Sequence, residues 1–330
     1  MMKRLKRFLR AFRTWFLNDM HATAQDSQLL LGRLASWRVR SMGVISSLQD
    51  VEFKVTSQWG EDGVIDWLIE RANIPTTSHS FIEFGVETYR EANTRFLMQN
   101  RNWRGLIIDG SSAMVDAAKA DDLYWKYDLT AQPAFITREN INDLIADAGF
   151  SRDVGLLSID IDGNDYWVWE AIETIRPIIV VCEYNAIFGD IHPISTPYDP
   201  AFETGTAHFS RLYHGTSIEA LRLLGTRKGY RFIGTTTAGN DAFFVREDYA
   251  RNFVDKSLLN ITAWPSRARG ARDITGQLSY TSGLNRLTLI SGMPVINTVT
   301  GETVNIDTLG TMYSDTWLAT ITGLAVAEAS

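Results

Sequence analysis

Carboxylates stand at the ends of strand-like runs in this chain, where an α/β sheet would present them to a ligand. Asp109 closes the apolar run Gly105–Ile108, and a second run, Phe81–Phe84, lies upstream and ends at Gly85. A strand, a glycine turn, a helix and a second strand ending in a carboxylate is typical of adenosine-binding α/β domains. The glycine lets the backbone approach the ligand, and the carboxylate takes the ribose hydroxyls. The alternative is an ordinary parallel sheet with one turn glycine.

A second group of oxygen-bearing residues follows the next two runs. Asp160 and Asp162 alternate at the end of one run, so both side chains can project to one side, and Glu183 and Asn185 repeat the alternation after the other. Ligands of open α/β sheets bind at the carboxyl ends of the strands, and four such residues suit Mg²⁺ or a similar hard cation. Asp160 and Asp162 are therefore candidate catalytic residues, and all four are candidate metal ligands. The alternative is that Asp160 orders a cofactor and the others hydrogen-bond to loops.

Two histidines flank the end of a long polar loop, residues 186–214, which is long enough to be a lid or substrate loop. Histidine titrates near neutrality, so His208 or His214 is a candidate general base for a hydroxyl proton. Loop histidines are also common as solvated residues without a catalytic role.

The elements that must position these residues alternate between helix and strand. We expect parallel strands at 81–84, 105–108, 124–127, 155–161 and 178–183, with helices at 57–72, 91–100, 114–120, 140–148, 166–175 and 217–229. Residues 230–235 and 241–245 flank a Gly239-Asn240 turn and predict an antiparallel hairpin. Five parallel strands closed by an antiparallel pair resemble the sheet of class I S-adenosylmethionine methyltransferases.

The chain therefore predicts an α/β fold: a Rossmann-like sheet with helices on both faces, an N-terminal helical segment and a C-terminal β-rich appendage. We expect the divisions at 1–50, 51–250 and 251–330, the last as an appendage or interface. The net charge of -7 argues against a general nucleic-acid binder. The single cysteine, Cys182, excludes an internal disulfide and fits a reducing cytoplasm. No apolar run reaches the length of a membrane span.

The basic charge gathers at the N-terminus. Residues 3–17 hold six Lys or Arg and no acid, and their apolar residues repeat at helical spacing. A basic amphipathic helix of this kind suits an anionic membrane surface, here the inner face of the cytoplasmic membrane. The alternative is a helix docked on the body of the protein or on a second subunit in a homo-oligomer.

Four segments resemble FkbM-type methyltransferases, and the resemblance covers about residues 55–247. They are Ser57–Asp62, Phe81–Val86, Asn102–Ser111 and Leu157–Gly163. Asp162-Gly163 takes the place of the acidic-glycine pair of the family's strand-four pattern. Glu83 stands where Asp is common, and the second glycine of the loop after the first strand is missing.

The resemblance implies S-adenosylmethionine as cofactor and a sugar or glycan hydroxyl as acceptor, with a divalent cation as a further cofactor. Backbone near Gly85 would lie by the methionine part, Asp109 would hold the ribose, and Asp128 would contact the adenine edge. The residues predicted to bind the cofactor are Gln58, Glu83, Gly85, Val86, Asp109, Gly110, Ser111 and Asp128.

Two other functions stay open. Asp160-Ile161-Asp162 is also the Asp-x-Asp pattern of glycosyltransferases that hold a nucleotide sugar through Mn²⁺ or Mg²⁺. That function leaves the pairing of Gly85 with Asp109 unexplained. A non-catalytic, membrane-associated scaffold with a decayed cofactor pocket is the third possibility.

Overall fold

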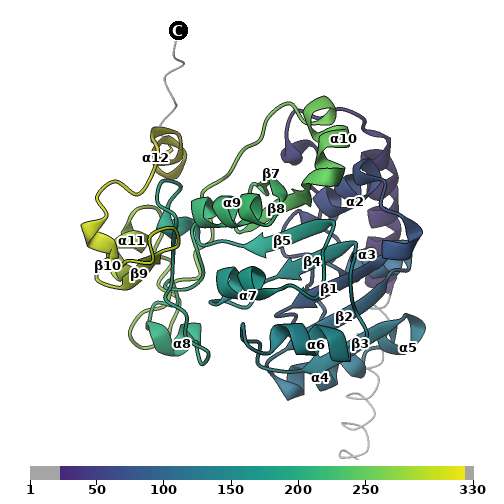
Figure 1. Cartoon of the computed structure of the whole chain (residues 1–330), viewed down its shortest axis with the longest axis horizontal. Coiled ribbons are helices and arrows are strands. Elements are labelled where there is room, and N and C mark those ends of the chain that lie inside the picture. Colours follow the sequence, from purple (N-terminus) through teal and green to yellow (C-terminus); the bar gives the residue numbers. More distant parts are fainter. Residues whose placement is uncertain (1–22, 324–330) are drawn as a thin grey trace, which may run out of the picture.

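The computed structural model describes residues 23–323, and its centre is a seven-stranded sheet in the order β3-β2-β1-β4-β5-β8-β7 (Figure 1). Its strands are β1 (Ser80–Phe84), β2 (Arg104–Asp109), β3 (Leu129–Pro133), β4 (Leu156–Ile159), β5 (Ile179–Glu183), β7 (Tyr230–Thr235) and β8 (Asp241–Arg246). The strands from β3 to β5 pair in parallel, and β8 runs antiparallel to both β5 and β7. The predicted Rossmann-like sheet with its closing antiparallel hairpin is confirmed.

Helices cover both faces of this sheet. Successive side chains of each strand point to opposite faces, and the apolar side chains on both faces are buried. Ile82 and Val180 belong to an apolar cluster shared with α6, α7 and α9, whereas Phe81 and Ile179 belong to a cluster shared with α2, α3, α4 and α10. The α-helices are α2 (Glu61–Ala72), α3 (Arg95–Arg101), α4 (Ser112–Lys119), α5 (Leu123–Lys126), α6 (Ile141–Asp147), α7 (Asp165–Ala171), α8 (Thr204–Ala207), α9 (Ile218–Arg227), α10 (Glu247–Ser257), α11 (Asn285–Ile290) and α12 (Asp315–Thr322). Short 3₁₀-helices are η1 (Leu48–Val51), η2 (Thr76–Ser78), η3 (Ala186–Phe188) and η4 (Ile306–Thr308).

The prediction of a strand at 124–127 is wrong. That segment is the helix α5, and β3 begins only after Asp128. The carboxylate of Asp121 accepts the backbone N–H of Leu123 and so starts a helical turn. Trp125, whose aromatic character suggested a strand, is 75% exposed in this turn. Local hydrogen bonding at the helix start therefore outweighed the β propensity of the aromatic residues.

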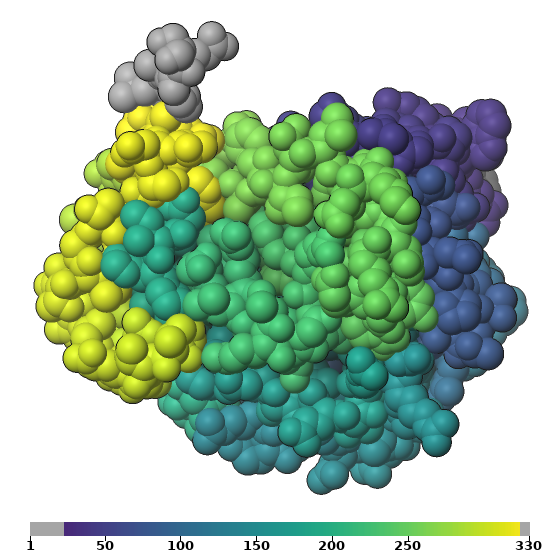
Figure 2. All heavy atoms as spheres, turned by 45° about the horizontal axis from the view of Figure 1, so that its top comes forward, coloured from purple at the N-terminus to yellow at the C-terminus, as the bar shows by residue number. Residues whose placement is uncertain are grey.

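The C-terminal part packs against the loop between β5 and α9, which we call the β5–α9 loop (residues 184–217). Its strands β9 (Pro294–Asn297) and β10 (Thr303–Asn305) form a three-stranded sheet with β6 (Ile194–Ser195) of that loop. Tyr313 donates to the carbonyl of Ile187 at 2.8 Å. In the space-filling view the yellow C-terminal residues lie directly against teal residues of the loop (Figure 2). The expected division at residue 250 stays a prediction.

At the other end, residues 23–41 form a helix with an exposed apolar stripe of Leu30, Leu31, Leu34 and Trp37. The segment 3–17, for which membrane contact was predicted, lies outside the described residues. Within residues 23–323, no helix combines the length and the apolar character needed to cross a bilayer.

Candidate functional site

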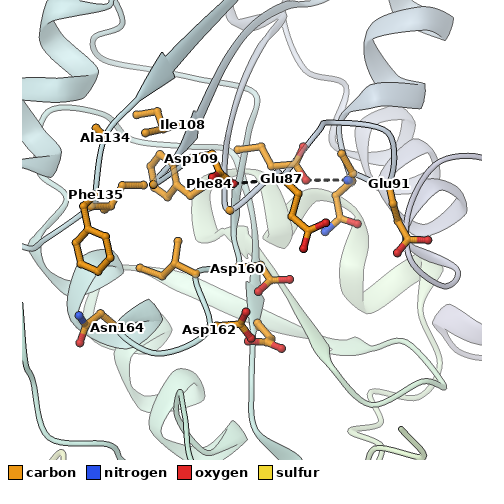
Figure 3. A pocket seen from close by; sticks show the side chains of 18 of the residues that line it. Phe84, Glu87, Glu91, Ile108, Asp109, Ala134, Phe135, Asp160, Asp162 and Asn164 are labelled. Carbon is orange, nitrogen blue, oxygen red and sulfur yellow. Dashed lines mark hydrogen bonds between the residues drawn. The ribbon is translucent and has the colours of Figure 1, made fainter. Parts of the chain in front are cut away.

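A cavity of about 400 Å³ opens at the carboxyl ends of the parallel strands (Figure 3). Its walls come from the ends of β1, β2, β3, β4 and β5, from the start of β8, and from the β5–α9 loop. The lining residues are Gln58, Glu83, Phe84, Gly85, Glu87, Glu91, Ala92, Asn93, Ile108, Asp109, Gly110, Ala134, Phe135, Ile136, Asp160, Ile161, Asp162, Asn164, Glu183, Phe202 and Asp241. This is the edge at which open α/β sheets bind their ligands.

The turn after β1 is built around a close approach between two backbones. Gly85 has a φ of 73°, and a Cβ at this position would lie 1.6 Å from the carbonyl oxygen of Asp160. Glu87 and Tyr89 adopt left-handed φ values of 47° and 59°. Non-glycine residues thus adopt backbone conformations that glycine takes more readily, at a cost in strain of about 1–3 kcal/mol each.

Glu83 stabilises this turn from below. Its carboxylate accepts the backbone N–H of Asn93 at 2.7 Å and of Thr94 at 3.0 Å, and it also accepts the Thr94 hydroxyl. Burial raises the pKa of Glu83 to about 7, although these hydrogen bonds oppose the rise. Glu83 lies in the cavity wall as predicted, but its oxygens are already engaged in holding the turn.

Asp109 joins the turn to the helix that follows β2. One carboxylate oxygen accepts the N–H of Glu87 at 2.7 Å, and the other accepts the N–H of Ser111 at 2.8 Å. Of its predicted companions, Gly110 lines the cavity, whereas Ser111 caps α4 and Val86 is buried in the apolar core. Each oxygen of Asp109 keeps further acceptor capacity toward the cavity.

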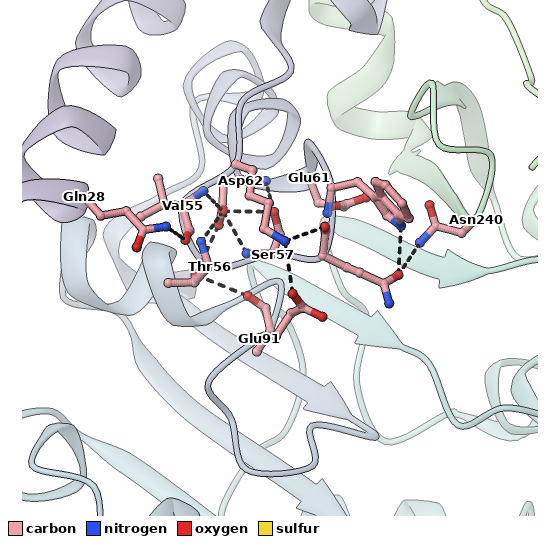
Figure 4. A network of polar contacts seen from close by, with 12 residues as sticks. Gln28, Val55, Thr56, Ser57, Glu61, Asp62, Glu91 and Asn240 are labelled. Carbon is pink, nitrogen blue, oxygen red and sulfur yellow. Dashed lines mark hydrogen bonds and ion pairs between the residues drawn. The ribbon is translucent and has the colours of Figure 1, made fainter. Parts of the chain in front are cut away.

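Gln58 reaches the rim of the cavity from a segment held by a buried carboxylate (Figure 4). Asp62 accepts the backbone N–H groups of Val55, Thr56 and Ser57 at 2.7–2.9 Å. Gln28, on the N-terminal helix, donates to the carbonyl of Val55. The network therefore ties the helix at 23–41 to the segment that carries Gln58.

Asp128 does not lie at the cavity, and its predicted contact with an adenine edge is not supported. Because β3 starts after it, Asp128 stands at the amino end of that strand, and its side chain is 74% exposed beside Arg104. The residues that follow β3 into the cavity wall are Ala134, Phe135 and Ile136. With the end of β3 placed correctly at Pro133, the apolar run that follows it would have been predicted to line the cavity.

The acidic residues after β4 and β5 do come together. Asp160 directly follows β4, Glu183 ends β5, and Asp241 begins β8 in register with Glu183. Burial, followed by repulsion from neighbouring acids, raises the pKa values of Asp160, Glu183 and Asp241 well above their ordinary range. Sequence reasoning missed Asp241, although its place after the Gly239-Asn240 turn puts an antiparallel strand start at this edge.

Asp165 stabilises the turn that carries Asp160 and Asp162. Its carboxylate accepts the N–H of Ile161 at 2.8 Å and of Gly163 at 2.9 Å. Burial raises its pKa to about 6. Asp162 itself takes a left-handed φ of 55°, which directs the chain out of the sheet toward the cavity.

His214 joins this acidic group, but Asn185 and His208 do not. Ligand atoms of Asp162, Glu183 and His214 lie within 4.8 Å of one another, as do those of Asp160, Asp165 and Glu183. Burial lowers the pKa of His214, and the charge of Asp162 opposes that shift. The Nδ1 atom of His214 is buried, lies 3.7 Å from Glu183 and has no hydrogen-bond partner among the described residues.

The two other candidates have structural contacts instead. Asn185 donates to the carbonyls of Leu212 and His214 and accepts the N–H of Ile187, so its amide closes the loop that carries His214. The Nδ1 atom of His208 lies 2.7 Å from the Ser210 hydroxyl, and His208 is not part of the cavity wall.

The cavity wall is strongly acidic. It holds eight carboxyl-bearing residues and no Lys or Arg among the described residues that line it. The eight are Glu83, Glu87, Glu91, Asp109, Asp160, Asp162, Glu183 and Asp241. Such a wall attracts a cationic ligand or a metal ion and repels an anion.

The comparisons with known proteins give only distant likenesses. No family model matches the chain, and no curated protein matches it. A putative O-methyltransferase from Klebsiella pneumoniae is 12% identical over 66% of this chain and 90% of its own, with a TM-score of 0.37. The O-methyltransferase from Bacillus cereus, in complex with SAH, is 12% identical over 66% of this chain and 89% of its own, with a TM-score of 0.37. The CurJ carbon methyltransferase is 11% identical over 61% of this chain and 57% of its own, with a TM-score of 0.38. Likenesses of this size do not assign an activity to this chain.

The close approach at Gly85 gives a test of the turn. Gly85→Ala should lower the free energy of unfolding by about 2 kcal/mol or more, since the methyl group meets the Asp160 carbonyl and φ is positive. Gly110→Ala is the matched control, because its Cβ would meet only the Phe135 ring at 3.4 Å. Urea unfolding of both variants measures the difference. Equal stability of the two would contradict the close approach.

Proposed function

We propose that this protein is an S-adenosylmethionine-dependent O-methyltransferase that acts on a sugar or glycan hydroxyl. The observation that carries the proposal is the pairing, on one cavity wall, of Asp109 with the strained turn at Gly85–Tyr89. The free acceptor capacity of Asp109 fits two ribose hydroxyls. Ile108 and Phe135 offer apolar surface for a purine ring, and the acidic wall fits a sulfonium cation. The residues present therefore suit this cofactor.

The acceptor would enter from the side of β5, where Glu183, Asp241 and the β5–α9 loop meet. Phe202 of that loop lies in the cavity wall and packs so closely on Gly163 that a Cβ there would lie 2.2 Å from the ring. An aromatic face of this kind suits the apolar face of a sugar. A sugar hydroxyl is a weak nucleophile, so the transfer needs orientation and removal of its proton.

We further propose that a divalent cation binds to Asp162, Glu183 and His214, with Asp160 beside them. Carboxylate oxygens and a neutral imidazole are suitable ligands, and the lowered pKa of His214 keeps the ring neutral. Such an ion lowers the pKa of a bound hydroxyl and holds the acceptor in place. His214 would then act as a ligand, and in the absence of an ion it is the general base nearest the acids.

Glycosyl transfer through Asp160 and Asp162 remains the second candidate. A nucleotide sugar carries a diphosphate, and no Lys or Arg stands among the described residues of the cavity wall to meet it. Methyl transfer also uses Asp109 and the turn at Gly85, which glycosyl transfer leaves without a role. A scaffold without activity is favoured still less, because the pocket is well formed and not filled by side chains.

We also propose that the N-terminal region contacts an anionic membrane surface on the cytoplasmic side. The helix at 23–41 supports this proposal. Leu30, Leu34 and Trp37 are 58–76% exposed at helical spacing. Arg33 and Arg38 lie exposed beside them, and the segment 3–17 adds six more basic residues. Apolar side chains flanked by cations are what an interfacial helix presents to acidic lipid.

Cofactor binding should depend on Asp109 and not on Asp128. Asp109→Ala should weaken S-adenosylmethionine binding by about 1–3 kcal/mol, the scale of hydrogen bonds to a charged group. Asp128→Ala is the matched control and should bind normally, because its side chain lies outside the cavity. Isothermal titration of both folded variants measures this. Unchanged affinity in Asp109→Ala would remove the ribose assignment.

The metal site can be tested without an acceptor. Mn²⁺ added to the chain should give one tightly bound ion by electron paramagnetic resonance, and Glu183→Gln and His214→Asn should each weaken it by about tenfold or more. His208→Asn, a change in the same loop but outside the cavity, should leave Mn²⁺ binding intact. With an acceptor in hand, a chelator should stop methyl transfer and Mg²⁺ should restore it. Equal binding by the His208 and His214 variants would contradict this ligand set.

Membrane contact should require both apolar surface and positive charge. The full chain should sediment with phosphatidylserine-containing vesicles, and less so as salt rises. The double variant Leu34→Ser/Trp37→Ser should reduce binding about tenfold, through lost burial of apolar side chains. Ile274→Ser, at an apolar residue 80% exposed in the C-terminal part, is the control. Dimerisation that the stripe variant abolishes, with no vesicle binding, would assign the stripe to a second copy instead.

A further inference from the structure

Seven carboxyl groups at or near the cavity fall into two kinds. Asp62, Glu83, Asp109 and Asp165 each accept at least two backbone N–H groups. Asp160, Glu183 and Asp241 accept none among the described residues. The first kind is stabilised by the backbone of the fold, whereas the second kind lines the cavity without a backbone donor among the described residues.

Asp241 is the clearest member of the second kind. It is only 3% exposed, and its Oδ1 atom has no hydrogen-bond partner among the described residues. Its other oxygen meets the Asn240 amide at 3.3 Å, and the neighbouring Asn93 side chain opposes the rise of its pKa. A carboxyl group this deeply buried is costly to ionise unless a cation approaches it.

Apart from the Asn93 and Asn240 amides, the side chains that act on Asp241 are acidic. Glu61 of α2, Glu83 of β1 and Asp165 of α7 act on it, and Asp160 and Glu183 complete the circle from β4 and β5. Lys54, whose partner Glu91 lines the cavity, is bonded to that carboxylate and to the carbonyl of Gln58. No Lys or Arg among the described residues that line the cavity compensates Asp241, so a cationic ligand is a suitable partner for it.

We propose that Asp241 makes this cavity select its cofactor by charge, so that S-adenosylmethionine binds more tightly than S-adenosylhomocysteine. The inference rests on the proposed function and adds a specificity-determining residue to it. When a methyl group leaves the sulfonium for the acceptor oxygen, a C–O bond forms, the electron pair of the C–S bond stays on sulfur, and the hydroxyl proton passes to His214 as general base. The cofactor thereby loses one positive charge, and its electrostatic attraction to the acidic wall becomes weaker. Product release follows from the chemistry itself.

The experiment compares three ligands on the full chain in excess chelator, by isothermal titration. S-adenosylmethionine and sinefungin, which carries an ammonium group near the sulfonium position, should each bind about tenfold more tightly than S-adenosylhomocysteine, a difference of about 1.4 kcal/mol. Equal or tighter binding of the homocysteine product would overturn charge selection while leaving the methyltransferase proposal intact. Binding of none of the three would instead overturn the proposed function.

A pair of isosteric variants assigns the effect to Asp241. Asp241→Asn should reduce the preference to about threefold or less, by weakening the two charged ligands and leaving S-adenosylhomocysteine unchanged. Asp128→Asn removes an exposed carboxylate outside the cavity and should keep the full preference. A full preference in folded Asp241→Asn would overturn the assignment. Should that variant fail to fold, the three-ligand comparison on the unaltered chain still decides whether charge is selected.

Discussion

Several carboxylates are buried at one edge of the sheet, and the cost of removing them from water is the constraint on which the rest of the structure depends. An isolated buried carboxylate is unstable, so each one must be hydrogen-bonded, protonated or paired with a cation. The fold applies the first solution to Asp62, Glu83, Asp109 and Asp165, whose oxygens receive backbone N–H groups. These four contacts fix the segment before α2, the turn after β1, the start of α4 and the turn after β4. The walls of the cavity are therefore rigid because its structural acids are satisfied.

The remaining acids are left for something that the chain does not supply. Asp160, Glu183 and Asp241 converge from three strands, and their pKa values rise because they are buried together. A metal ion, a sulfonium group or bound protons can each compensate them. The metal proposal and the charge-selection proposal are thus two consequences of one electrostatic arrangement, and they compete for the same carboxylates.

The C-terminal part supports the loop that completes the cavity wall. His214 and Phe202 lie on the β5–α9 loop, which would be a long unsupported connection without partners. Asn185 closes the loop from inside, and the hydroxyl groups of Tyr213 and Tyr313 bond across it to the carbonyls of Pro294 and Ile187. The C-terminal part thus supports the β5–α9 loop, which contributes Phe202 to the cavity wall.

The sequence by itself determined the α/β alternation, the closing hairpin and the presence of Asp109, Asp160 and Glu183 at strand ends. These are local properties, since apolar runs of strand length and turn residues between them mark where each strand stops. One such boundary was wrong, because a helical turn started by Asp121 competed with the β propensity of aromatic residues, and that single error placed Asp128 at the wrong end of β3.

Only the tertiary structure decided which oxygens are free. Asp109 and Asp160 look alike in the sequence, yet one receives two backbone N–H groups and the other receives none. Asp241 and His214 belong to the site because an antiparallel strand and a braced loop return to the same edge. Asn185 leaves it because its amide is used within the loop. Pairings between residues so far apart in the chain depend on how the elements pack, and no local pattern encodes them.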